Sequence, residues 1–254
     1  MKLTIKEIGD ITGGQAVGDP SALVTGVSID SRSIDKNQLF VPIKAKRNGH
    51  DFVSDAIRNG ATGHLFSEGK AQGNAVKVND TLIALQDLAK FERKRITGDV
   101  IGITGSVGKT TTKDILFASL RNLTEVHVSK LSFNNELGLP LTILSAESST
   151  KHLILEMGAR GPGQIAELAK IATPTIGIVT RVASAHTQFF QDIDHIAETK
   201  GALVELLPSS GTAILNNDDP RVAEMSKRTN AEIVTYGLED ATVTARKISI
   251  NNDL

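Results

Sequence analysis

The sequence predicts an α/β protein with two domains, a small N-terminal α/β domain over residues 1–97 and a second domain over residues 98–254. In the first, short strands alternate with short helices. In the second, nearly all-apolar strands alternate with amphipathic helices, which is typical of a mainly parallel sheet covered by helices on both faces. A length of 254 residues allows one or two domains, since a domain averages about 150 residues.

The N-terminal domain is predicted to begin with a helix over residues 4–12, in which Thr4 is an N-cap and Glu7 completes a capping box. β-rich runs bounded by turn residues then predict strands at residues 24–30, 38–43, 63–67 and 75–78. Apolar residues near helical spacing predict a connecting helix over residues 81–96. The domain boundary therefore falls near residue 97.

The second domain alternates strand and helix along its length. Strands are predicted at residues 99–104, 152–157, 175–182, 211–217 and 232–237, and helices at residues 109–123, 163–172, 192–207 and 220–229. Asp219 as N-cap with Pro220 at the first helical position explains the start of the last helix better than a nucleotide contact does. Residues 241–254 alternate like one more strand.

The composition excludes several classes of site and partner. The 28 basic and 29 acidic side chains give a net charge of -1, so no overall field attracts nucleic acid or an anionic membrane. The absence of cysteine removes disulfides, thiolate catalysis and Cys-ligated zinc. The first residues lack an apolar signal core, and a run of about 18 apolar residues occurs nowhere. We therefore expect a soluble cytoplasmic protein without membrane insertion.

The segment GITGSVGKTTTKD, residues 102–114, follows an apolar strand and leads into a helix. This order lets backbone N–H groups surround phosphate oxygens and offers a lysine and a hydroxyl to phosphate and Mg²⁺. The pattern departs from a strict G-x-x-x-x-G-K-[ST], because Ile103 stands five residues before Gly108. A tight turn with a solvated lysine is the alternative. The expected phosphate-binding residues of this P-loop domain are Gly105, Ser106, Val107, Gly108, Lys109, Thr110 and Thr111.

Glu156 and His186 follow predicted strands, where ligands of a parallel sheet bind. Glu156 ends the apolar run HLILE, so its carboxylate could hold Mg²⁺ at the carboxyl end of the strand. A solvated glutamate is the alternative. His186 lies in the loop ASAHTQFF after the strand at residues 175–182, where a structural role is the alternative to a functional one.

Lys200 lies at the centre of the apolar stripe of the helix predicted at residues 192–207. Its neighbours at minus seven, minus four, minus three, plus three and plus four are all apolar. A charged amine there is costly unless it is paired, neutral or chemically modified, and a neutral amine can react with CO₂ to form a carbamate. Snorkelling to the surface beside Gly201 is the alternative.

Six segments in this order resemble the ATP-dependent Mur ligases of peptidoglycan synthesis: GITGSVGKTTTKD, SFNNELGLPLT, LILEMGARGPGQI, VTRVASAHTQFF, ETKG and LNNDDPRV. The resemblance spans nearly the whole chain. FNNELG and the earlier DSRSIDKNQLFVPIKAKRNGHDF are most similar to the member that adds D-Ala-D-Ala to UDP-N-acetylmuramoyl-tripeptide. The member that adds the third residue of the stem peptide is the close alternative, and it usually carries Thr-Thr-Pro where Asn134 and Asn135 stand here.

The resemblance implies an acyl-phosphate mechanism with ATP and two Mg²⁺ ions. The implied catalytic residues are Lys109, Lys200 and His186. The implied metal ligands are Thr110, Glu156, His186 and Lys200, the last as a carbamate. The residues implied to hold the uridine diphosphate end of the substrate are Ser31, Arg32, Asn48 and His50, and those for its muramoyl part are Asn134 and Asn135. A monomer is expected.

One departure from the family bears on activity. Family members have a third, C-terminal domain and an adenine-contacting motif like H-N-x-x-N, and neither occurs before Leu254. We therefore expect an incomplete ATP-binding domain and a chain that turns over poorly on its own. The alternatives to a ligase are a nucleotide-binding module that docks a protein partner through its N-terminal domain and a catalytically silent fragment.

Overall fold

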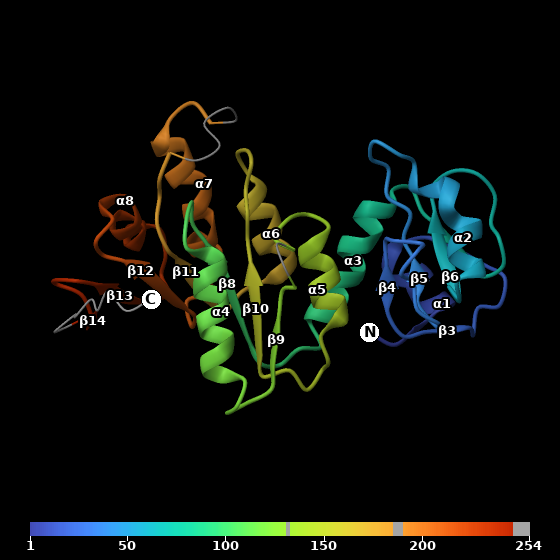
Figure 1. Cartoon of the computed structure of the whole chain (residues 1–254), viewed down its shortest axis with the longest axis horizontal. Coiled ribbons are helices and arrows are strands. Elements are labelled where there is room, and N and C mark those ends of the chain that lie inside the picture. Colours follow the sequence, from blue (N-terminus) through green and yellow to red (C-terminus); the bar gives the residue numbers. More distant parts are fainter. Residues whose placement is uncertain (131–132, 185–189, 246–254) are drawn as a thin grey trace, which may run out of the picture. The chain divides into compact units, whose positions relative to one another are not determined.

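The computed structural model describes residues 1–130, 133–184 and 190–245 and divides the chain into two compact α/β units (Figure 1). The first unit combines Met1–Thr97 with Glu136–Thr150, and the second combines Gly98–Asn135 with Lys151–Leu254. The sequence predicted that the second domain is continuous from residue 98, whereas residues 136–150 belong to the first unit. The reason is that they form the almost wholly apolar helix α5 (Gly138–Ser145), which packs against α3 (Thr81–Arg93).

The first unit holds a five-stranded sheet in the order β2-β7-β6-β5-β4, parallel except between β2 and β7, and an antiparallel pair of β1 and β3. Besides α3 and α5, its elements are β1 (Leu3–Thr4), α1 (Ile5–Thr12), β2 (Gln15–Val17), β3 (Leu23–Val24), β4 (Val27–Ser28), β5 (Leu39–Phe40), the 3₁₀-helix η1 (Gly49–Phe52), α2 (Val53–Arg58), β6 (Gly63–Phe66) and β7 (Ala75–Lys77). The predicted capping box of Thr4 and Glu7 is confirmed.

The single strand predicted at residues 24–30 is wrong. Val24 ends β3, which pairs with β1, whereas Val27 begins β4, which pairs with β5. The chain therefore leaves one sheet for another between them, and Thr25 N–H donates to the carbonyl of Asn37 instead of continuing a ladder. The alternating pattern of side chains is the same for one strand and for two, so the sequence did not separate these cases.

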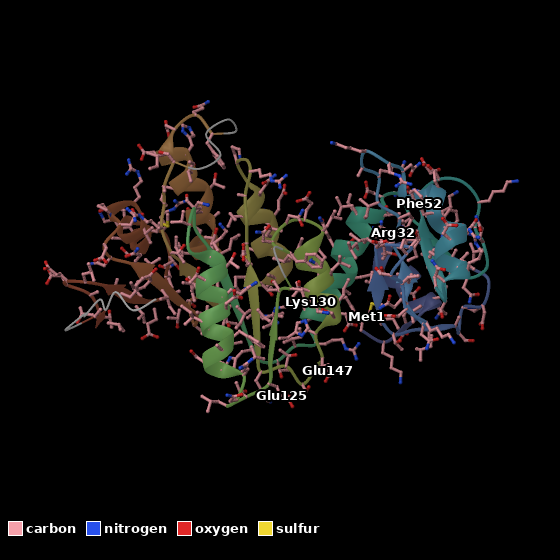
Figure 2. All side chains as sticks on the ribbon, viewed as in Figure 1. Met1, Arg32, Phe52, Glu125, Lys130 and Glu147 are labelled. Carbon is pink, nitrogen blue, oxygen red and sulfur yellow. The ribbon has the colours of Figure 1, made fainter. Side chains whose placement is uncertain are left out.

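The second unit is a seven-stranded sheet in the order β14-β13-β12-β11-β8-β10-β9, in which every pair is parallel. Its elements are β8 (Asp99–Thr104), α4 (Lys109–Leu120), β9 (Val126–Val128), β10 (His152–Glu156), α6 (Gln164–Ala172), β11 (Ile176–Val179), α7 (Ile193–Glu205), β12 (Thr212–Asn216), α8 (Pro220–Ala223), the 3₁₀-helix η2 (Glu224–Arg228), β13 (Glu232–Gly237) and β14 (Val243–Thr244). The predicted fold class is confirmed. The sequence missed β9, a three-residue strand between Glu125 and Lys130, which are labelled in Figure 2.

The strand order places the carboxyl ends of β8, β10 and β11 side by side, where ligands of parallel sheets bind. Helix α4 covers one face of the sheet, and α6 and α7 cover the other (Figure 1). Gly102 of β8 and Gly177 of β11 are register partners, and Leu203 of α7 packs over both. Their missing side chains therefore let α7 approach the sheet closely. None of the helices in the described part of the chain has the length and apolar character needed to cross a bilayer.

Candidate active site

The loop at residues 105–108 joins the end of β8 to the start of α4. Gly108 has a φ of +86°, a left-handed conformation that favours glycine, and a Cβ on Gly105 would clash with Thr180 Oγ1. Five successive backbone N–H groups have no acceptor in the part of the chain that the structure describes, those of Val107, Gly108, Lys109, Thr110 and Thr111. Free N–H groups at a helix N-terminus attract an anion. The loop therefore has the geometry of an anion-binding site.

Lys109 lies over this loop. Its Nζ donates to the carbonyl oxygen of Gly105 at 2.8 Å. Burial lowers the pKa of Lys109, while the Glu156 carboxylate acts in the opposite direction. The ammonium is therefore partly removed from water. In this partly buried position its attraction for a phosphate is stronger than at the open surface.

Glu156 ends β10 and contacts two residues from other segments. Thr110 Oγ1 donates to Glu156 Oε2 at 2.9 Å, and Asn134 Nδ2 donates to Oε1 at 2.8 Å. The residue is 2% exposed, so it is not the solvated glutamate of the alternative interpretation. A buried carboxylate held by two neutral donors keeps lone pairs available for a cation.

The donor chemistry of Thr110 and Glu156 fits Mg²⁺, which prefers hydroxyl and carboxylate oxygens. Within residues 1–130, 133–184 and 190–245, no three His, Cys, Asp or Glu side chains gather into a metal site. A Mg²⁺ ion here would thus take its other ligands from phosphate and water. His186, the predicted ligand of a second ion, lies outside the described residues.

Lys200 lies in α7, one turn before Leu203, and is 5% exposed. It does not snorkel beside Gly201, because the guanidinium of Arg228 fills that space. No hydrogen bond or ion pair joins its ammonium to another described residue. Burial, and after it the nearby Lys109 ammonium, lower the pKa of Lys200 from its usual 10.5 to about 8. The site therefore contains a buried lysine amine that has no partner among the described residues.

Asp219 begins α8 as predicted, because its Oδ1 accepts the N–H of Arg221 at 3.0 Å and Pro220 is the first helical residue. Its Oδ2 accepts the N–H of Val182 at 2.8 Å. The helix-start interpretation is confirmed. The same carboxylate also holds the segment that follows β11.

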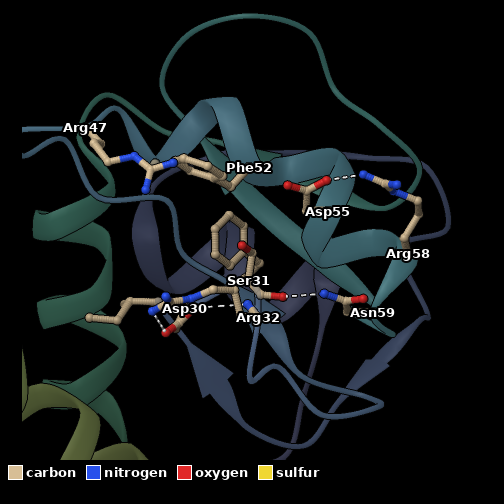
Figure 3. A pocket seen from close by; sticks show the side chains of 11 residues that line it. Asp30, Ser31, Arg32, Arg47, Phe52, Asp55, Arg58 and Asn59 are labelled. Carbon is tan, nitrogen blue, oxygen red and sulfur yellow. Dashed lines mark hydrogen bonds and ion pairs between the residues drawn. The ribbon is translucent and has the colours of Figure 1, made fainter.

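Ser31 and Arg32 line a cavity of about 770 Å³ in the first unit (Figure 3). Arg32 pairs with Asp30 at 2.7 Å, and the guanidinium of Arg47 lies 4.4 Å from the ring centre of Phe52. The other lining residues are Ile29, Phe40, Gly49, Asp55, Arg58 and Asn59. Arginines beside aromatic rings suit a ligand that carries both anionic groups and a planar ring.

Asn48 and His50 line a different cavity of the first unit, of about 310 Å³. Asn48 Oδ1 accepts the N–H of His50 at 3.1 Å and lies 3.0 Å from His50 Nδ1, while Asn48 Nδ2 donates to Glu68. His50 Nε2 accepts the N–H of Ser67 at 3.1 Å. The structure therefore does not bring this pair into the cavity of Ser31 and Arg32, and it occupies both side chains with local hydrogen bonds.

The fully buried His64 lines the same cavity and has the same hydrogen-bond pattern as His50. Its Nε2 accepts the N–H of Gln72 at 3.1 Å. Both rings are neutral in this arrangement, because a protonated Nε2 would face an N–H donor. Burial lowers the pKa of both histidines, and for His50 the Glu68 carboxylate acts in the opposite direction.

We expect acid to destabilise the first unit. The folded-state pKa of His50 and His64 lies below the usual 6.5, so the unfolded chain takes up protons first and stability falls as the pH drops below 6.5. Amide hydrogen exchange at pH 7.5 and 5.5, corrected for the intrinsic rates, should show lower protection of Ser67 and Gln72 at pH 5.5. The His195→Gln control, in the second unit, should leave this change intact. Equal protection at both pH values would contradict the prediction.

The family is decided by comparison with known proteins. A family model described as the Mur ligase middle domain matches residues 103–253, more than half of the chain. The chain belongs to the Mur ligase family. A second model, described as the Mur ligase family, catalytic domain, matches residues 23–93 of this Mur ligase chain. The resemblance stated from the sequence segments is therefore confirmed.

Three similar proteins locate this Mur ligase chain within the family. The UDP-N-acetylmuramoyl-tripeptide--D-alanyl-D-alanine ligase of Synechocystis sp. is 39% identical over 226 residues, 87% of this chain and 50% of that protein. MurF from Acinetobacter baumannii has a TM-score of 0.92 and 27% identity over 98% of this chain and 56% of that one. MurF ligase from Thermotoga maritima, solved in complex with ADP, has a TM-score of 0.79 and 34% identity over 86% of this chain and 51% of that one. The chain thus spans about half the length of the curated relatives it matches.

Sequence reasoning missed two kinds of residue in this Mur ligase chain. Arg47 and Phe52 form the stacked pair of the larger cavity, although Arg47 begins the RNGH turn that the motif did contain. Thr180 contacts the loop at residues 105–108, and its only signal is a hydroxyl at the end of the apolar run TIGIVT. The Arg47–Phe52 contact depends on the local fold of that turn, whereas the Thr180 contact joins segments 73 residues apart.

Proposed function

We propose that this chain carries the ATP-binding and UDP-substrate-binding parts of a ligase that joins D-Ala-D-Ala to UDP-N-acetylmuramoyl-tripeptide. One observation carries the proposal: free loop N–H groups, Lys109, the Thr110–Glu156 pair and Lys200 converge at one edge of the sheet. Relatives at 39% and 34% identity are named as this ligase or as MurF, which favours it over the member that adds the third stem residue. A cytoplasmic location and a monomeric state belong to the same proposal.

The arrangement has a chemical logic for acyl activation. A carboxylate is a poor electrophile, so one of its oxygens first attacks the γ-phosphorus of ATP, ADP leaves, and an acyl phosphate forms. The D-Ala-D-Ala amine then attacks the acyl carbon, phosphate leaves with the carboxylate oxygen, and the amine loses a proton. Lys109 and the loop N–H groups would bind the phosphoryl oxygens. Mg²⁺ held by Thr110 and Glu156 would offset the repulsion between the substrate carboxylate and the γ-phosphate.

Lys200 is proposed to act as a carbamate. Its neutral amine attacks the carbon of CO₂, and loss of one proton leaves a carboxylate on the side chain. A pKa of about 8 makes the neutral amine available near physiological pH. This modification turns an isolated cation into an oxygen donor that, with His186, would support a second Mg²⁺ ion.

The first unit is proposed to hold the uridine diphosphate end of the substrate. Support comes from the larger cavity, where Arg32 and Arg47 offer charge to a diphosphate and the rings of Phe40 and Phe52 offer contact to a base. Asn48 and His50 remain predicted contacts from the adjoining turn, and Asn134 and Asn135 remain predicted contacts of the muramoyl part.

Isothermal titration of the chain with UDP-N-acetylmuramoyl-tripeptide tests this function. We expect binding that requires the uracil base and becomes roughly tenfold weaker in Arg32→Ala, because a charge-assisted hydrogen bond is lost. The matched control is Arg95→Ala, since Arg95 also pairs with a nearby carboxylate, that of Glu92, but lies outside the cavity. Absence of uracil-dependent binding would favour a nucleotide-binding module that docks a protein partner.

A further inference from the structure

The phosphate-binding loop is fastened to the segment that follows β11. Ser106 N–H donates to the carbonyl of Arg181 at 2.6 Å, and Ser106 Oγ donates to the carbonyl of Ala183 at 2.9 Å. Ala183 N–H donates back to Ser106 Oγ at 3.0 Å. Thr180 Oγ1 donates to the carbonyl of Val107 at 2.6 Å. The conformation of the loop therefore depends on residues 180–183, which lie outside the glycine-rich segment GITGSVGKTTTKD.

Among these contacts, the one from Thr180 sets the direction of a loop peptide. Thr180 is 6% exposed, and its hydroxyl lies closer to the carbonyl of Val107, at 2.6 Å, than to that of Thr104, at 3.2 Å. A trans peptide is planar, with its C=O and N–H pointing in opposite directions. Holding the Val107 carbonyl toward Thr180 thus points the Gly108 N–H away from Thr180. That N–H is one of the five without an acceptor in the described chain.

Thr180 is itself held from the next two strands. Its carbonyl accepts Asn216 Nδ2 at 2.8 Å and Tyr236 Oη at 3.3 Å. Asn216 ends β12 and Tyr236 belongs to β13, so the contacts run across the sheet toward β8. Burial raises the pKa of Tyr236, and Asp218 and Asp219 act in the same direction, so its hydroxyl stays a donor.

We propose that Thr180 is a positioning residue for the phosphate-binding loop, and that Asn216 and Tyr236 hold it in place from β12 and β13. The inference rests on the proposed function in one respect, that the loop binds nucleotide phosphates. Thr180 touches no phosphate itself. It orients the Gly108 N–H, and that N–H binds the phosphate.

Binding of Mg²⁺-ADP to the 254-residue chain, measured by isothermal titration, tests this role. Thr180→Val keeps the side-chain shape but leaves the part-buried carbonyl of Val107 without its donor, so we expect roughly tenfold weaker ADP binding. Thr180→Ser restores the hydroxyl and should bind ADP within about twofold of the wild type. In an amide NMR spectrum, the Gly108 resonance should move in Thr180→Val and stay near its wild-type position in Thr180→Ser.

Two matched controls separate positioning from general stability. Thr175→Val removes a hydroxyl that pairs with the N–H of Val100 at the other end of β11. The second control, Thr235→Val, removes a hydroxyl of β13 that accepts the N–H of Thr242. It lies next to Tyr236, whose variant Tyr236→Phe is a test and not a control: it removes only the hydroxyl that donates to the Thr180 carbonyl and should weaken ADP binding about threefold. The controls should bind ADP like the wild type. If Thr180→Val does not fold, Tyr236→Phe and Thr180→Ser still test the proposal.

The outcomes are distinguishable. Wild-type affinity in both Thr180→Val and Tyr236→Phe would overturn the positioning role and leave the proposed function standing. Equal losses of ADP affinity in Thr180→Val, Thr180→Ser and Thr175→Val would mean that Thr180 has a merely structural role. That result would also overturn the positioning role. A wild-type chain that binds no ADP would contradict the proposed function and the positioning role together, since the loop would then have no phosphate to bind.

Discussion

Lys109→Ala is expected to slow phosphoryl transfer by roughly a hundredfold to a thousandfold, because the variant loses the ammonium that offsets charge on the transferred group. In the structure, Lys109 Nζ lies 2.8 Å from the Gly105 carbonyl, within the loop that would surround the phosphates. The measurement is phosphate release from ATP with saturating UDP-tripeptide and D-Ala-D-Ala. Lys170→Ala, which removes an exposed lysine of α6, is the matched control and should leave the rate unchanged.

The same variant should bind UDP-N-acetylmuramoyl-tripeptide as well as the wild type does. The reason is that Lys109 belongs to the second unit, whereas the cavity of Ser31 and Arg32 belongs to the first. Titration with the UDP-tripeptide gives this result independently of turnover. Loss of both transfer and UDP-substrate binding would contradict the assignment of the two roles to different units.

Lys200→Ala should lower the rate of ligation by at least about a hundredfold, and bicarbonate or a short carboxylic acid should restore part of it, since a small carboxylate can occupy the space that the side chain leaves. A second readout does not depend on turnover. Wild-type protein equilibrated with ¹³C-labelled CO₂ should give a carbamate carbon signal that Lys200→Ala lacks. That signal should fall as the pH drops below about 8, because the ammonium form cannot attack CO₂.

The matched control for Lys200 is Lys227→Ala, an exposed lysine paired with Glu224. This variant should keep both its activity and the carbamate signal. Lys200→Arg keeps a positive charge but forms no carbamate, so it should be as slow as Lys200→Ala. Unchanged turnover in Lys200→Ala would contradict the proposal that Lys200 acts as a carbamate.

Local features of the site could be predicted from the sequence because each depends on adjacent residues. The glycine-rich turn before Lys109 and the N-cap at Asp219 are short-range signals of backbone geometry. Glu156 could be placed at a strand end because an apolar run stops there. Helical spacing placed Lys200 at the centre of an apolar stripe but left snorkelling open, and the structure shows that the side chain is buried.

Contacts between distant segments could not be predicted in the same way. Asn134, which follows β9, reaches Glu156 because β9 pairs with β10, and Thr180 reaches Val107 because β11 pairs with β8. A parallel sheet leaves that order open, since each connection can run in either direction along it. The position of α5 was missed for a related reason, because an apolar helix carries no signal of the surface it will cover.

The measurement that tests the central claim most directly is a crystal structure of the chain with Mg²⁺ and a non-hydrolysable ATP analogue. We predict phosphate oxygens within hydrogen-bond distance of the free N–H groups from Val107 to Thr111, with Lys109 Nζ moved from the Gly105 carbonyl onto phosphate and the metal between Thr110 and Glu156. An analogue bound elsewhere, or a loop that stays empty at saturating analogue, would contradict the account.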